Sequence, residues 1–125
     1  MKVEISNGEI LDKFSILEIK INRIKDEQKL QNVSKEIEEL KPNVKALLNE
    51  GQIIKLYLEL KNANETLWAI EDSIRNKERL KEFDEEFIQL ARAVYLTNDK
   101  RADIKKQINN LTGSELIEEK SYEKY

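Results

Sequence analysis

The sequence contains neither cysteine nor histidine among its 125 residues. Without cysteine, disulfide bonds and thiolate metal sites are excluded. Without histidine, catalysis by a Ser-His or Cys-His pair within one chain is excluded as well. Any metal site must therefore use oxygen ligands, which favour Mg²⁺, Mn²⁺ or Ca²⁺ over Zn²⁺.

Glycine and proline are also scarce, with three Gly and one Pro. A chain with so few turn-forming residues is built from a few long elements. Hydrophobic residues make up 39% and charged residues 38%, which is too apolar for a disordered chain and too charged for a protein buried on all sides. Because Lys, Glu, Leu and Ile are abundant and favour helix over strand, the sequence predicts an all-α fold in one domain.

Long apolar runs are absent too. No stretch approaches the roughly 20 residues that a membrane helix needs, and residues 1–5 lack the apolar region of a signal peptide. The net charge of −3 gives no reason to expect nucleic-acid binding. We therefore expect a cytoplasmic protein that neither crosses a membrane nor binds nucleic acid.

What the sequence does contain is apolar residues at alternating spacings of three and four, which is typical of amphipathic helices. The pattern Ser6-x-x-Glu9 has the form of a capping box and predicts that the first helix begins near residue 7. Residues 2–5 alternate like a short strand and are expected to form a short extended arm. Asp26 is a plausible cap for a second helix, and Pro42 predicts a kink or a helix end near Lys41.

Two further helices are expected in the second half of the chain. A third should begin just after Gly51, and a fourth should be capped by Asp84 and end at Gly113. Long helices joined by short turns predict an antiparallel bundle of three to four helices. Residues 1–113 would form the single helical domain and residues 114–125 a C-terminal tail. The apolar repeat is long enough to be compatible with a coiled-coil homodimer as well.

The apolar pattern fails in one place. On the stripe of the fourth helix, Thr97 and Arg101 occupy positions that earlier helices fill with Leu or Ile. An arginine on a core-facing position needs a carboxylate partner. The candidate partners are Glu71, Asp72, Asp12 and Glu18. The functional interpretation is a pocket between helices that binds an anion or a metal, and the plainer one is a structural ion pair or an arginine that reaches solvent.

Carboxylate clusters suggest an alternative function. An E-x-x-E pattern at residues 36–39 is followed by Glu71 and Asp72 and then by Asp99. All-α nucleotide pyrophosphohydrolases use acidic helix-borne motifs of this general kind, although no E-x-x-D lies on a plausible facing helix here. The alternative is a Mg²⁺-dependent enzyme on nucleotides or nucleotide-sugars, with Glu71, Asp72 and Asp99 as metal ligands and Arg101 facing phosphate.

Several blocks of the sequence resemble a family of small, uncharacterised, all-helical bacterial and phage proteins with no assigned activity. The opening reads ISNGEILDK followed by ILEIK, and the close reads LTNDKRADIKKQIN and then GSEL with EEKSY. Residues 64–68 and 70–72 resemble the middle of the same family. The motif positions form the candidate polar cluster: Asp12, Lys13, Glu18, Asn64, Trp68, Glu71, Asp72, Asn98, Asp99 and Arg101. Trp68, the single tryptophan, is either the floor of a ligand pocket or a core or interface anchor.

The leading hypothesis is a small cytoplasmic binding or assembly module with a polar cluster between its helices. It would present helix faces and the tail to a protein partner or to a second copy, without a cofactor and without enzymatic activity. If it is such a module, the clustered carboxylates should pair with Arg101, Lys13 or Arg75. A third hypothesis holds that the cluster only fixes helix register, and it predicts that Arg101→Leu keeps or raises stability.

Overall fold

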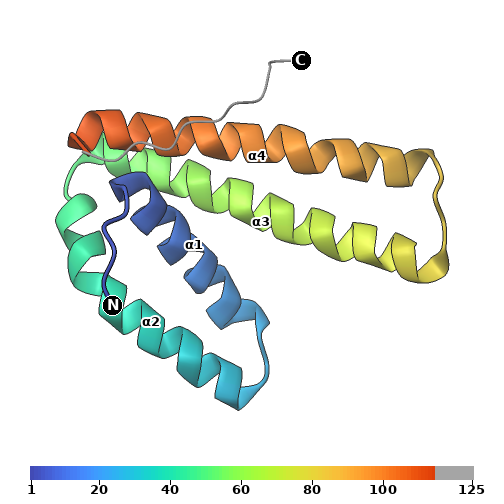
Figure 1. The fold of residues 1–125 in the computed structure, drawn as a ribbon, viewed down its shortest axis with the longest axis horizontal. Coiled ribbons are helices and arrows are strands. Elements are labelled where there is room, and N and C mark those ends of the chain that lie inside the picture. The colour runs from blue at the N-terminus through green and yellow to red at the C-terminus, as the bar shows by residue number, and fades with distance from the viewer. Residues whose placement is uncertain (115–125) are drawn as a thin grey trace.

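The computed structural model describes residues 1–114 and contains four helices (Figure 1). They are α1 (Asn7–Arg23), α2 (Glu27–Leu47), α3 (Gly51–Leu80) and α4 (Glu85–Thr112). No strand occurs in this part of the chain, and residues 1–5 lie outside any helix. The predicted all-α bundle is therefore confirmed. Beyond Ser114, the predicted C-terminal tail lies outside the described residues.

The helix ends follow local capping chemistry. Ser6, Asp26 and Asp84 each accept a hydrogen bond from the backbone N–H three residues later, at 3.1, 3.0 and 3.0 Å. Each bond satisfies one of the donors that the first turn of a helix leaves without a partner. α4 ends at Gly113, whose φ of 65° lies in the left-handed region that glycine adopts without strain.

Pro42 predicted either a kink or a helix end near Lys41, and the helix end does not occur. α2 continues through Pro42 to Leu47. Proline removes a single backbone donor, so only the carbonyl of Glu38 loses its bond within the helix. Val44, which follows Pro42, is only 4% exposed and belongs to the core. Burial of the Val44 side chain therefore favours a helical conformation for the part of α2 that follows the proline.

The four helices form two antiparallel hairpins of unequal length (Figure 1). α1 packs against α2, α3 and α4, and α3 packs along α4. The core lies where the hairpins meet and comprises Leu11, Phe14, Val44, Ile53, Leu56, Tyr57, Leu60, Ile104 and Ile108. No residue between Asn64 and Ile104 is buried. The outer part of the α3–α4 hairpin, residues 70–96, therefore extends beyond the core, and we call it the outer hairpin.

None of the helices in the described part of the chain is both long enough and apolar enough to cross a membrane.

Candidate functional site

The centre of the candidate site is an ion pair between α1 and α4. Asp12 is 1% exposed. Arg101 donates from Nε to its Oδ1 at 2.9 Å and from Nη2 to its Oδ2 at 2.5 Å. This two-pronged geometry is the strongest that a guanidinium and a carboxylate can form. Of the four carboxylates that the sequence offered to Arg101, the structure brings Asp12 to it.

Neutral side chains complete the hydrogen bonding around this pair. Asn64 of α3 donates from Nδ2 to Asp12 Oδ1 at 2.9 Å and to Ser15 Oγ at 2.7 Å, and Ser15 Oγ donates to the Asp12 carbonyl at 2.7 Å. Arg101 Nη1 donates to Asn98 Oδ1 at 3.2 Å. We call these five residues the Asp12 cluster. No buried side-chain nitrogen or oxygen in the described residues lacks a partner, as a stable buried polar network requires.

The charge state of Asp12 follows from its surroundings. Burial raises the pKa of Asp12, but hydrogen bonds from Arg101 and Asn64 and the positive charges of Arg101 and Lys105 outweigh it, so the pKa lies below 3.8. Lys105 Nζ lies 3.8 Å from Asp12 Oδ2 and 3.1 Å from Glu9 Oε2. Asp12 is therefore an ionised carboxylate at neutral pH. Its role is to hold cations, and it is a poor candidate for a general acid.

Glu18 and Lys13 are among the predicted residues that lie apart from the Asp12 cluster. Glu18 accepts a hydrogen bond from the hydroxyl of Tyr57 and lies 3.8 Å from Lys61 Nζ. Burial and the neighbouring Glu18 raise the pKa of Tyr57. Lys13 forms a 3.9 Å ion pair with Glu36, with both side chains about half exposed.

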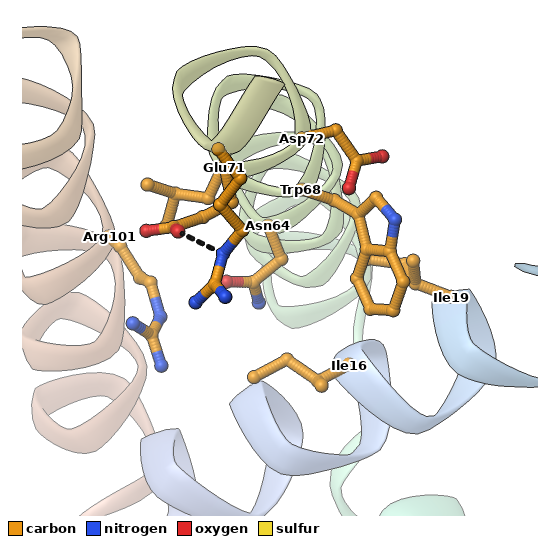
Figure 2. A pocket seen from close by; sticks show the side chains of 9 residues that line it. Ile16, Ile19, Asn64, Trp68, Glu71, Asp72 and Arg101 are labelled. Atoms are coloured by element: carbon orange, nitrogen blue, oxygen red, sulfur yellow. Dashed lines mark hydrogen bonds and ion pairs between the residues drawn. The ribbon is translucent and has the colours of Figure 1, made fainter. Parts of the chain in front are cut away.

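Two clefts flank Arg101. The larger one, the Trp68 cleft, has a volume of about 410 Å³ and lies between α1, α3 and α4 (Figure 2). It is lined by Ile16, Ile19, Asn64, Leu67, Trp68, Glu71, Asp72, Arg75 and Arg101. The smaller cleft, of about 240 Å³, shares Ile16 and Arg101 with it and includes Asp12 and Lys13. Asp99 is half-buried on α4 and lines neither cleft.

The predicted metal ligands are arranged differently from what a magnesium site needs. Glu71 accepts a 3.3 Å hydrogen bond from Arg75 Nε, which is the pairing expected of a binding module. Within residues 1–114, no group of three or more Asp or Glu side chains is placed so that it could hold a metal ion. The magnesium hypothesis stays a prediction, and no geometry in this part of the chain supports it.

Sequence reasoning missed a close contact between the start of α1 and the end of α4. The backbone N–H of Gly8 donates to Asn109 Oδ1 at 2.7 Å. A Cβ atom at Gly8 would lie 2.6 Å from the backbone oxygen of Lys105, so only glycine permits this approach. Both Gly8 and Asn109 fall within the blocks that carry the family resemblance, and that resemblance was the available signal.

The whole chain, residues 1–125, matches the model of a family of unknown function, DUF6165. The chain belongs to this family. No curated protein and no solved structure matches it. The family therefore names no reaction, and a function has to be inferred from the fold and the clefts.

Proposed function

We propose that this member of the DUF6165 family is a helical assembly module that binds a second copy of itself through the outer hairpin. One observation carries the proposal. The outer hairpin exposes five large apolar side chains, each between 43% and 58% exposed: Leu80, Phe83, Ile88, Tyr95 and Leu96. A contiguous exposed apolar surface is typical of a protein–protein contact, and the proposal requires these five side chains to form one.

The exposed flank of the contact between α3 and α4 is suited to binding a helical partner. Along the outer hairpin, the residues between these two helices are only half-buried: Ile70, Ile74, Phe87, Leu90 and Val94. Two helices bury one stripe on each other and leave the flank of that stripe exposed. The outer hairpin of a second copy, related by a two-fold axis, would cover the flank and complete a four-helix bundle.

The tip of the outer hairpin is ordered before any partner binds. Lys77 Nζ lies 3.2 Å from Glu82, 3.0 Å from Asp84 and 3.1 Å from Glu86. Phe83 and Phe87 meet edge to face with ring centroids 5.2 Å apart. A preformed surface loses little conformational entropy on binding. In this proposal the Asp12 cluster serves assembly by fixing α1 against the hairpin, and the location is the cytoplasm, as expected from the sequence.

Sedimentation velocity over a concentration series tests the proposal. We expect the full chain to form a dimer, and we expect Leu80→Ser combined with Ile88→Ser to shift it towards monomer. The control is Leu58→Ser, because Leu58 is 60% exposed on α3 outside the outer hairpin. A wild-type chain that stays monomeric at every concentration would contradict the proposal, as would equal effects of the two sets of substitutions.

A further inference from the structure

The Trp68 cleft has the size and lining of a small-ligand site. Its volume of about 410 Å³ falls within the range of roughly 300–1,000 Å³ that is typical of such sites. Ile16 and Ile19 of α1 form an apolar wall opposite the indole of Trp68, which projects from α3 (Figure 2). Trp68 is only half-buried, because α1 ends at Arg23 and the two hairpins diverge beyond it (Figure 1).

One carboxylate of the lining has no cationic partner among the described residues. Two guanidinium groups line the cleft, and each already holds a carboxylate: Arg101 is bonded to Asp12, and Arg75 to Glu71. Asp72, the remaining charged residue of the lining, makes no hydrogen bond or ion pair with residues 1–114. Asp72 is therefore the carboxylate of the lining that can attract a cation.

The neutral groups in the cleft also suit a cation. Both hydrogen bonds of the Asn64 amide are donated by Nδ2, which leaves its Oδ1 as an acceptor within the described part of the chain. The guanidinium of Arg23 lies 5.7 Å from the centroid of the Trp68 ring. Arg23 forms no ion pair among the described residues, and a guanidinium at this distance is attracted to the indole.

We infer that the Trp68 cleft binds an organic cation, namely an ammonium or guanidinium group carried on an apolar body. Trp68 and Asp72 are one helical turn apart and share a face of α3 (Figure 2). The apolar body would lie against Ile16, Ile19 and the indole, and the cationic group would reach Asp72 and the amide oxygen of Asn64. Glu71, Asp72 and Arg75 of the lining lie at the start of the outer hairpin, but none of the five exposed apolar side chains of the proposed dimer surface lines the cleft. Either proposal can therefore fail without the other.

The fluorescence of Trp68 reports directly on this cleft, because the chain has one tryptophan. The full chain is titrated with phenethylamine and with two probes of similar shape, neutral phenylethanol and anionic phenylpropionate. We expect a saturable change with the amine and none with the other two probes. Equal responses to amine and alcohol would overturn the inference, as would preference for the anion or no response to the amine.

Three substitutions separate the cationic interaction from simple apolar binding. We expect Asp72→Asn to weaken amine binding about three- to ten-fold. Glu65→Gln should leave binding unchanged, because Glu65 is exposed on the same helix but outside the lining. Arg23→Gln should strengthen binding, because it removes the cation that competes for the indole. Equal affinities for the Asp72 and Glu65 variants, or weaker binding after loss of Arg23, would contradict the inference.

The cation could belong to a free amine or to the side chain of a partner protein. The amide of acetyl-lysine separates these sources, because it carries the lysine side chain without a free α-amino group. If it binds at least as tightly as phenethylamine, the cleft takes a lysine of a partner. If phenethylamine binds more tightly, the cleft takes a free amine with an aromatic body.

Discussion

Asp12 and Arg101 are 89 positions apart in the sequence and form a two-pronged ion pair that fixes α1 against α4. The carboxylate is 1% exposed, whereas the arginine side chain is 25% exposed. The two partners therefore differ in how well water can replace the lost interaction. This asymmetry decides what their substitution should do.

Replacing Arg101 by Leu should destabilise the fold by about 3–5 kcal/mol, because a buried carboxylate loses its two-pronged partner and keeps only Lys105, 3.8 Å away, as a counter-charge. The hypothesis that the cluster only fixes helix register predicts instead that Arg101→Leu keeps or raises stability, so this variant separates the two. The measurement is the free energy of unfolding in urea. A loss within about 0.5 kcal/mol of zero would support the hypothesis that the pair only fixes helix register.

The pairing itself is measured by a double-mutant cycle with Asp12→Asn, Arg101→Met and both together. The double variant should be more stable than the sum of the single losses predicts, because it leaves no uncompensated buried charge. Asn64 can still donate to the amide oxygen of Asn at position 12. Additive losses would show that Asp12 and Arg101 contribute independently of each other.

Acid should weaken the fold through Asp12. Its pKa is lowered from 3.8 in the folded state, so the unfolded chain binds the proton first as the pH falls. The stabilisation from Asp12 is therefore complete above 3.8 and is lost as the pH falls through the lower, folded-state value. We expect the stability difference between wild type and Asp12→Asn to shrink below pH 3.8. A difference that stays constant with pH would contradict this assignment of the charge.

Features that depend on neighbouring residues could be predicted from the sequence. The caps Ser6, Asp26 and Asp84 bond to backbone three residues away, so the helix starts were correct. Pro42 shows where a local signal leaves two outcomes open, a kink or a helix end, and burial of Val44 beyond it favours continuation of α2. Propensity gives way to tertiary packing at such positions.

The candidate site was only partly predictable for the same reason. The polar break on the fourth helix correctly indicated that Arg101 needs a carboxylate, but choosing Asp12 among four candidates requires the packing of α1 on α4. Ser15 was missed because a serine within a helix is ordinarily exposed, whereas this one is buried and bonded to Asn64. Charge patterns identify the groups in such a site, and the crossing of the helices decides which of them meet.

The contact at Gly8 gives the last prediction. Gly8→Ala should destabilise the fold by about 1–3 kcal/mol, because the added Cβ would lie 2.6 Å from the Lys105 backbone oxygen and 3.0 Å from Asn109 Oδ1. A backbone atom cannot move aside like the end of a flexible side chain, so α1 would have to shift away from α4. That shift would lengthen the 2.7 Å bond from Gly8 N–H to Asn109.

Gly51→Ala is the matched control, because Gly51 is the first residue of α3 and a Cβ added there would meet no atom within 4 Å. It should be neutral or slightly stabilising, since alanine lowers the entropy of the unfolded chain. Thermal and urea unfolding of both variants measure the difference. If the two substitutions had the same effect, the approach of α1 to α4 at Gly8 would not need glycine, and the Asp12 cluster would have to hold these helices together without it.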